Sequence, residues 1–286
     1  MSADPRPSSL QRRSAARTAV VWDALREVLD GQHLAGQHPE GQHDGAVCVV
    51  DIGGGTGGFA VRVAELGHRV LVVDPSPDAL ATLARRADES GVADLVTGRQ
   101  GDLDSLGDLV PEPGPDGGPG ADVVLCHGVL DIVEEPVPAL RALARVLRPG
   151  GTLSLLVNQR HAAVVARAMA GHFQAARALL DHTVPPAPVA AAVPAPEEQG
   201  AGPRPEPGAS ASRRFTADEV ARALDEAGFD LATMQAVRVF VDLVPSSLVD
   251  LEPGAAQALV DLERAVATRP EYLPLGTQIH ALATRR

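Results

Sequence analysis

The segment 46–74 constrains the fold of this chain more than any other. It begins with the apolar run AVCVVD and continues with the glycine-rich sequence IGGGTGG. A stretch with helical spacing follows as far as Leu66, and a second apolar run, RVLVVD, closes the segment. Continuous apolar runs of this length are typical of strands that are buried on both faces of a sheet. The segment therefore predicts a strand, a tight turn, a helix and a second strand that pairs in parallel with the first.

The same alternation continues toward the middle of the chain. Ser76 and Pro77 suit the N-cap and the first turn of a second helix. Further elements are expected as strands at 94–97, 121–127 and 152–157, a helix at 137–147, a surface loop at 111–120 and a turn at RPGG, 148–151. Strands that alternate with helices predict an α/β fold with a doubly wound, Rossmann-like sheet.

The flanking regions complete the expected organisation. A first helix is expected at 11–30, and the three Gly-Gln-His units within 31–45 are interpreted as a low-complexity linker rather than as a metal site. In the C-terminal part we expect a helix at 159–181, a disordered Pro/Ala-rich insert at 185–212, a helix from the capping box Thr216–Glu219 to Gly228, a strand at 237–243, a helix at 255–268 and a strand at 277–283. The predicted units are an N-terminal helix and linker (1–45), a cofactor-binding core (46–158) and a substrate-side region that completes a seven-stranded mixed sheet (159–286).

Composition excludes several classes of protein. The net charge of −12 argues against a protein that holds nucleic acid through its overall field, although a local basic patch remains compatible with it. No apolar run approaches the roughly 18 residues of a membrane span, and the N-terminal arginines are not followed by the apolar core of a secretory signal. Two cysteines do not make a disulfide framework. These features predict a cytoplasmic protein without a membrane partner, and no metal site is expected.

The glycine loop indicates an adenosine-bearing cofactor. Glycines at 53, 55 and 57 permit close approach of the backbone, and the helix that follows offers free N–H groups. The same stretch also fits the dinucleotide fingerprint Gly53-x-Gly55-x-x-Gly58, with Asp74 at the end of the second strand for the ribose hydroxyls. The glycine spacing alone therefore leaves S-adenosylmethionine and NAD open.

Three further features favour S-adenosylmethionine. Asp51 ends the first strand, where an acid can receive the amino group of a methionine moiety. Gly101 and Asp102 follow the third strand, where an acid can accept the adenine amino group. The sequence LRPGGTL at 147–153 introduces a fifth strand in many methyltransferases. Over about 46–158 the chain resembles the class I S-adenosylmethionine-dependent methyltransferases.

Motifs outside this core resemble a narrower family, the tRNA 5-carboxymethoxyuridine methyltransferases, which methylate the carboxyl group of a modified wobble uridine. The matching pieces are Arg17 with Trp22, VVLCHGVLDIVEEP at 123–136, His161 with MAGHF at 169–173, VRVF at 237–240 with Asp242, and EYLPLGTQIH at 271–280. The resemblance implies tRNA as the partner and S-adenosylmethionine as the cofactor.

The resemblance also implies roles for individual residues. Arg17 would reach the methionine carboxylate, and His127 would face the cofactor at the end of the fourth strand. Gly53 and Gly54 would lie beneath the cofactor, Asp74 at the ribose, and Gln100 and Gly101 beside the adenine. Gly55 in the glycine loop and Asp102 beside the adenine are added as cofactor-binding candidates from the residue pattern itself. Arg238 is the candidate for orienting an acceptor carboxylate through a forked, charged contact, and His161 is a second candidate that would face the acceptor.

Departures from the family pattern keep other functions open. Val241 and Leu243 stand where the family carries His and Tyr around Asp242, and aromatic residues, which could stack on a base, make up 2% of the chain. The alternatives are a small-molecule O- or N-methyltransferase and a non-catalytic S-adenosylmethionine-binding protein. For an acceptor other than a carboxylate, His127, His161 and His280 are the candidate bases.

Overall fold

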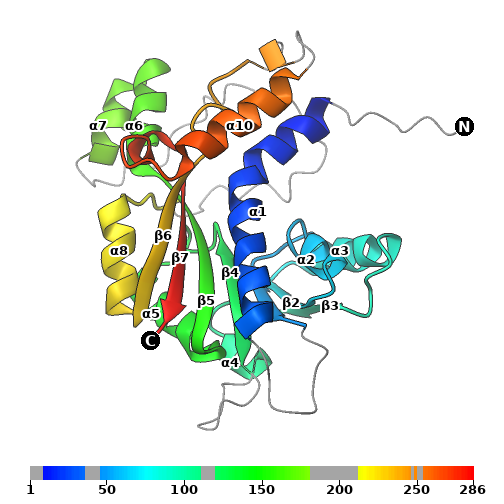
Figure 1. The fold of residues 1–286 in the computed structure, drawn as a ribbon. Helices are drawn as coiled ribbons and strands as arrows, with labels where there is room; N and C mark the ends of the chain where they lie inside the picture. Colours follow the sequence, from blue (N-terminus) through cyan, green and yellow to red (C-terminus); the bar gives the residue numbers. More distant parts are fainter. Residues whose placement is uncertain (1–8, 36–45, 111–119, 181–211, 246–247, 250–253) are drawn as a thin grey trace, which may run out of the picture.

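A seven-stranded mixed sheet forms the centre of the molecule (Figure 1). The computed structural model describes residues 9–35, 46–110, 120–180, 212–245, 248–249 and 254–286. The strands are β1 (Cys48–Ile52), β2 (Arg69–Asp74), β3 (Val96–Gln100), β4 (Ala121–His127), β5 (Leu147–Asn158), β6 (Phe229–Val237) and β7 (Gln278–Arg285), and their order in the sheet is β3-β2-β1-β4-β5-β7-β6. β1 to β5 pair in parallel, and β7 is antiparallel to both β5 and β6. The predicted fold class is therefore confirmed.

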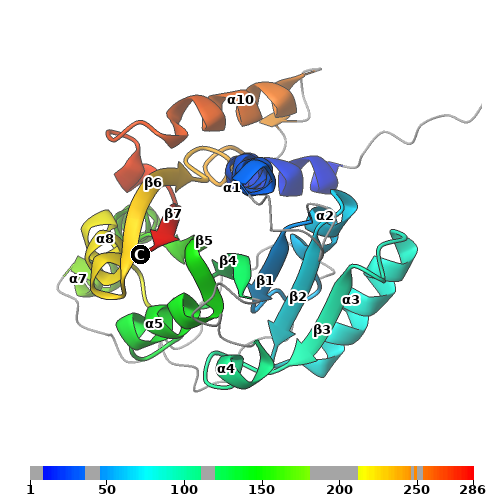
Figure 2. The ribbon, with the colours of Figure 1, turned by 60° about the horizontal axis from the view of Figure 1, so that its bottom comes forward.

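Helices cover both faces of this sheet (Figure 2). On one face lie α1 (Ser9–Ala35), α2 (Ala60–Glu65) and α3 (Pro77–Glu89), with α10 (Ala255–Ala267) packed beside α1. On the other face lie α4 (Leu106–Leu109), α5 (Pro136–Val146) and α8 (Ala217–Glu226). The helices α6 (Arg160–Met169) and α7 (Phe173–Leu180) follow β5 at the carboxyl edge of the sheet, and a short 3-10 helix, η1 (Leu273–Leu275), precedes β7.

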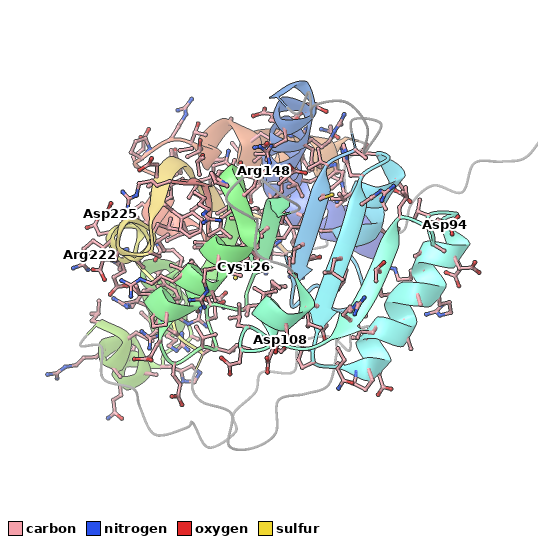
Figure 3. All side chains as sticks on the ribbon, turned by 90° about the horizontal axis from the view of Figure 1, so that it is seen from below. Asp94, Asp108, Cys126, Arg148, Arg222 and Asp225 are labelled. Carbon is pink, nitrogen blue, oxygen red and sulfur yellow. The ribbon has the colours of Figure 1, made fainter. Side chains whose placement is uncertain are left out.

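Alternate residues of the central strands enter two separate cores, which explains why the strands read as continuous apolar runs. In β1, Val50 and Ile52 belong to the core that also contains residues of α5 and α8, whereas Val49 belongs to the core that contains residues of α1 and α2. Cys126, which Figure 3 labels, belongs to the first core, and its neighbour His127 lies on the other face, where it contacts Ser154. This thiol and this imidazole therefore lie on opposite sides of the sheet. The exposed charged side chains that Figure 3 labels, such as Asp94 and Arg222, lie on the outer surface of the molecule.

Several predicted boundaries differ from the structure. α1 continues to Ala35, so the first Gly-Gln-His unit is helical rather than part of a linker. β3 begins and ends later than predicted, at Val96–Gln100. The predicted turn 148–151 lies inside β5, because Leu147 already pairs with Ala121 before a register shift restores regular pairing. The predicted single helix 159–181 is divided between α6 and α7, with Gly171 between them at a φ of 79°. Residues 111–119 and most of the predicted insert, 185–211, lie outside the described residues.

The predicted strand at 237–243 is wrong, because β6 ends at Val237 and a tight turn follows. The buried carboxylate of Glu263 on α10 accepts the backbone N–H groups of Val239, Phe240 and Val241 at 2.7–2.9 Å. Because these three N–H groups bind Glu263, they do not form the ladder hydrogen bonds of a strand. The apolar sequence VRVFVDL reads as a strand, and the distant acid that folds it into a turn leaves no local signal.

We predict that Glu263→Ala destabilises the protein strongly, because three backbone donors would lose their acceptor. Leaving a buried donor unsatisfied costs about 1–3 kcal/mol, so a loss of roughly 3 kcal/mol is expected. For a chain of this size that corresponds to a melting temperature lower by about 6–12 °C. The exposed Glu271 provides a matched control, and Glu271→Ala should leave the melting temperature nearly unchanged. Equal melting temperatures for the two variants in differential scanning calorimetry would contradict this role of Glu263.

Candidate active site

The glycine loop after β1 has no room for side chains at its first two glycines. Gly53 adopts a φ of 67°, and a Cβ atom there would lie 2.4 Å from Val129 Cγ2. A Cβ atom on Gly54 would lie 2.5 Å from the Asp51 carboxylate. The loop thus passes close to the ends of β1 and β4, and it leaves its backbone accessible to a ligand.

Asp74, at the end of β2, fixes this loop from the neighbouring strand. Its Oδ2 accepts the Gly55 N–H at 2.9 Å, and its Oδ1 accepts the Ser76 N–H at 2.9 Å. The side chain is nearly buried but lines the cavity described below. A carboxylate has further lone pairs after two such bonds, so Asp74 can still accept ribose hydroxyls.

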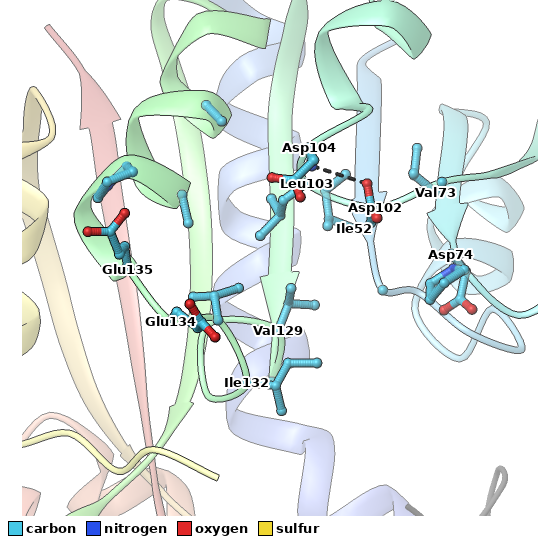
Figure 4. A pocket seen from close by; sticks show the side chains of 18 of the residues that line it. Ile52, Val73, Asp74, Asp102, Leu103, Asp104, Val129, Ile132, Glu134 and Glu135 are labelled. Carbon is cyan, nitrogen blue, oxygen red and sulfur yellow. Dashed lines mark hydrogen bonds between the residues drawn. The ribbon is translucent and has the colours of Figure 1, made fainter. Parts of the chain in front are cut away.

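A cavity of about 870 Å³ lies between the carboxyl ends of the central strands and α5 (Figure 4). Of the predicted cofactor-binding residues, those that line it are Gly53, Asp74, Gly101, Asp102 and His127. The cavity also has an apolar wall and an acidic rim that the sequence did not predict. The wall consists of Ile52, Val73, Leu103, Val129 and Ile132, and the rim includes Asp104, Glu134 and Glu135. The motif VVLCHGVLDIVEEP contains half of these residues, but its pattern alone does not indicate which of its side chains face a ligand.

The two predicted adenine neighbours behave differently. Asp102 Oδ1 accepts the N–H groups of Asp104 and Ser105 and the Ser105 hydroxyl, and these bonds hold the pKa of Asp102 below its usual value. The carboxylate thereby stays ionised while it shapes the turn after β3. Gln100 instead donates to the Pro75 carbonyl at 3.2 Å and is not among the residues that line the cavity.

Asp51 is a buried acid on the face of the sheet that α1 and α2 cover. Its residue is 3% exposed, and burial, with a smaller contribution from Asp74, raises its pKa to about 7. Asp51 pairs with Leu125 of β4, two residues before His127, so both side chains point to the same face near the carboxyl edge. A cationic group bound there would stabilise the ionised form of Asp51.

His127 ends β4 and lines the cavity. Its Nε2 lies 2.9 Å from the Ser154 hydroxyl, and its ring packs edge-on against Phe59 with centroids 4.9 Å apart. Its Nδ1 is buried and has no hydrogen-bond partner among the described residues. Burial lowers the pKa of His127 to about 4, so the imidazole is neutral at physiological pH.

Arg17 and Arg238 come together on one carboxylate outside this cavity. Asp242 lies 3.2 Å from Arg17 Nη2 and 2.6 Å from Arg238 Nη2, and it also accepts the Thr277 hydroxyl at 3.2 Å. Arg238 has a φ of 62°, which is uncommon for a residue other than glycine and occurs where surrounding contacts enforce it. Its Nε is buried and has no hydrogen-bond partner within the described chain. The cluster carries one net positive charge and offers one unused donor.

His161 lies apart from the other predicted residues. It is exposed in the first turn of α6, where its backbone N–H donates to Gln159 Oε1 at 2.8 Å. It does not line the cavity, and within the described residues no hydrogen bond or ion pair joins it to Arg238.

The residues present fit S-adenosylmethionine. The cavity joins a side-chain-free glycine loop, the Asp74 carboxylate and the turn at Gly101, which suit an adenosine, to a buried imidazole lone pair at His127. Within the described residues, no group of His, Cys, Asp and Glu is arranged to hold a metal ion. No helix in the described part of the chain is long and apolar enough to cross a membrane.

Comparisons with known proteins agree with this assignment. Residues 50–153 match a family described as a methyltransferase domain. The chain is 28% identical over 239 residues to the tRNA 5-carboxymethoxyuridine methyltransferase of Escherichia coli K12, which covers 83% of this chain and 79% of that protein. It is 35% identical over 132 residues to the ubiquinone biosynthesis O-methyltransferase of Xanthomonas campestris, which covers 46% of this chain and 51% of that protein.

Solved structures agree on the fold. An S-adenosylmethionine-dependent methyltransferase from Mesorhizobium loti superposes with a TM-score of 0.53 at 18% identity, covering 94% of this chain and all (100%) of that one. A magnesium protoporphyrin IX methyltransferase from Synechocystis, solved with bound S-adenosylhomocysteine, gives 0.53 at 15% identity and covers 99% of this chain and 90% of that one. A cyclase gives 0.54 at 20% identity, with 99% and 84% covered, so this fold by itself does not specify a reaction. The sequence matches decide the class: the chain is an S-adenosylmethionine-dependent methyltransferase with the class I fold, similar to the tRNA 5-carboxymethoxyuridine methyltransferases.

We predict that affinity for S-adenosylhomocysteine falls as the pH drops below about 7. The pKa of Asp51 is raised to about 7, so acidification protonates it and removes the charge that a cofactor ammonium group would neutralise. Binding to the ionised form alone weakens the apparent affinity about tenfold for each pH unit below the pKa. Isothermal titration calorimetry between pH 5.5 and 8.5 measures this slope.

Two controls separate Asp51 from general acid effects. 5′-Methylthioadenosine lacks the amino group, so its affinity should be nearly constant over the same pH range. Asp51→Asn should weaken binding of S-adenosylhomocysteine and remove the slope. A slope that persists in Asp51→Asn would assign the titration to another group.

Proposed function

We propose that the chain transfers a methyl group to the carboxylate of 5-carboxymethoxyuridine in tRNA. The observation that carries this proposal is the Arg238 guanidinium, which Asp242 holds through Nη2 while its buried Nε–H lacks a partner in the described chain. A guanidinium group with an unused N–H donor can bind a carboxylate through charge-assisted hydrogen bonds. The similarity to the Escherichia coli tRNA 5-carboxymethoxyuridine methyltransferase over 83% of this chain supports the choice of carboxylate.

The proposed methyl transfer requires the protein only to align the methyl donor with the acceptor and to provide a suitable electrostatic environment. When bound, S-adenosylmethionine supplies an electrophilic methyl group on a sulfonium. A carboxylic acid has a pKa of about 4, so the acceptor is already ionised at neutral pH and no residue has to remove a proton. The work left to the chain is to orient the acceptor and to exclude water. This agrees with a neutral, buried His127 that has no carboxylate to raise its basicity.

Asp242 would place the two arginines for two different carboxylates. We assign the methionine carboxylate to Arg17 on α1 and the acceptor carboxylate to Arg238 after β6. Because Asp242 already takes part of the charge of both arginines, each holds its ligand less tightly, and the acceptor oxygen keeps its nucleophilicity. His161, exposed at the start of α6, remains a proposed contact to the acceptor nucleotide rather than a base.

A small-molecule acceptor is the second candidate, and the charge distribution favours it. The cavity has an acidic rim that includes Asp104, Glu134 and Glu135, and the chain carries a net charge of −12. Both features repel a polyanion such as tRNA. The similarity of 46% of the chain to the ubiquinone biosynthesis O-methyltransferase points in the same direction.

Mass spectrometry of tRNA nucleosides from a deletion strain distinguishes the two candidates. The tRNA proposal predicts that the methyl ester of 5-carboxymethoxyuridine disappears and the free acid accumulates. Expression of the wild-type chain should restore the ester. An unchanged nucleoside profile would overturn the tRNA assignment in favour of a small-molecule acceptor.

We predict that Arg238→Gln keeps cofactor affinity and loses turnover. A charge-assisted hydrogen bond contributes about 1.5–3 kcal/mol, so kcat/KM should fall by about 10- to 150-fold. Glutamine has the same backbone preferences at the positive φ of this position, which limits structural side effects. Exposed Arg222 on α8 provides the control, and Arg222→Gln should retain full activity.

The product offers an independent measurement. A methyl ester is hydrolysed by mild alkali, whereas an ether or a methylamine survives it. Alkali-stable transfer of a labelled methyl group, or an Arg238→Gln protein with unchanged kcat/KM, would count against a carboxylate acceptor.

A further inference from the structure

Four polar side chains form a continuous hydrogen-bonded row across the sheet, inside an otherwise apolar layer. His127 Nε2 lies 2.9 Å from Ser154 Oγ, and Ser154 Oγ lies 2.8 Å from His280 Nε2. His280 Nδ1 lies 3.3 Å from Gln235 Oε1. The four residues come from β4, β5, β7 and β6, which are successive neighbours in the sheet. Ser154 and His280 are fully buried, whereas Gln235 at the edge strand is partly exposed.

The direction of every proton in this row follows from its outer end. In the orientation that the Gln235 amide adopts, its oxygen faces His280 Nδ1, and with this orientation His280 Nδ1 is the donor. A neutral imidazole has only one N–H, so His280 Nε2 accepts from the Ser154 hydroxyl. The Ser154 oxygen then accepts from His127 Nε2–H. Burial keeps both rings neutral, since it lowers the pKa of His127 to about 4 and that of His280 to about 3.

His127 Nδ1 is thereby left with a lone pair and no proton. This atom is buried without a partner among the described residues, and the residue lines the cavity. Asp51 lies on the same face of the neighbouring strand, and burial and the nearby Asp74 raise its pKa with no opposing cation among the described residues. An imidazole lone pair and a carboxylate that point to the same face of two neighbouring strands suit a ligand that donates several N–H bonds, which is an ammonium group.

We propose that Ser154, His280 and Gln235 are positioning residues that fix His127 in its Nε2–H tautomer, so that its Nδ1 accepts a hydrogen bond from the ammonium group of the bound cofactor. The row thus links a partly exposed amide on β6 to the ligand-facing nitrogen on β4. With the opposite polarity, His127 would present an N–H toward the ammonium group, and the two donors would repel each other. The proposal concerns cofactor binding alone and does not depend on which acceptor the enzyme methylates.

Two substitutions at Gln235 test the polarity directly. Gln235→Glu retains an acceptor for His280 Nδ1 and preserves the direction of the row. Gln235→Lys offers only donors and reverses it, which transfers the proton of His127 to Nδ1. Both changes introduce a charge at a partly exposed position. Three strand spacings, about 14 Å, separate this position from His127, and 5′-methylthioadenosine binding reports any general effect of the introduced charge.

The first measurement is the nitrogen-15 spectrum of the imidazole of His127 in the ligand-free protein. We expect a non-protonated Nδ1 in the wild type and in Gln235→Glu, and a protonated Nδ1 in Gln235→Lys. Addition of S-adenosylhomocysteine to the wild type should shift the Nδ1 resonance toward that of a hydrogen-bonded acceptor, and 5′-methylthioadenosine should not. The same Nδ1 state in all three proteins, or equal shifts with both ligands, would overturn the proposal.

The second measurement is calorimetric affinity for the same two ligands. Gln235→Lys should bind S-adenosylhomocysteine about 10-fold or more weakly than Gln235→Glu, while both bind 5′-methylthioadenosine equally. Ser154→Ala interrupts the row and should also weaken S-adenosylhomocysteine selectively. Thr152→Val, which removes a hydroxyl from the same strand two residues earlier, is the matched control and should weaken neither ligand. Equal loss of both ligands in Ser154→Ala would indicate a general structural effect and would count against the proposal.

Discussion

The carboxylate of Asp74 holds together the part of the fold on which the site depends. It binds the glycine loop after β1 through the Gly55 N–H and the start of α3 through the Ser76 N–H. Two strands, one loop and one helix terminus are thereby fixed relative to a single side chain. Because both bonds use backbone donors, the loop keeps its shape whatever occupies the cavity. A ligand hydroxyl that reaches Asp74 meets a carboxylate whose orientation is already set.

The burial of Asp51 and His127 on one face of the sheet explains why this region favours a cationic ligand group. Asp51 and His127 are both shifted toward their neutral forms by burial, which raises the pKa of the acid and lowers that of the base. At neutral pH His127 is therefore uncharged and Asp51 is only partly ionised, which limits the electrostatic cost of folding. A cationic ligand group changes this balance, because it stabilises the ionised form of Asp51 in a low-dielectric environment. Because Asp51 has no ion-pair partner among the described residues to give up, its attraction to the cationic group contributes directly to the free energy of binding.

The sequence predicted the sheet and the glycine loop because their signals are local. Strands that are buried on both faces read as apolar runs, and the loop glycines lie next to one another in the chain, so Gly53 and Asp74 could be assigned directly. The turn at 238–244 could not be predicted, since the acid that shapes it, Glu263, lies about two dozen residues away. Ser154 could have been noticed as the polar residue within the run TLSLLV, but its two histidine partners become visible only from the strand order.

The acidic surface and the anionic acceptor become compatible if binding strength and positioning are supplied by different parts of the molecule. A net charge of −12 opposes long-range attraction of tRNA, so an RNA substrate would associate slowly and with a weak salt dependence compared with a basic enzyme. The Arg17–Asp242–Arg238 cluster acts at short range and carries one net positive charge in a partly buried setting, where screening by salt is weak. In the proposed reaction, such a cluster would bind the acceptor carboxylate at short range. Selectivity would then reside in the reacting group, and the surrounding surface would disfavour any nucleic acid that lacks it.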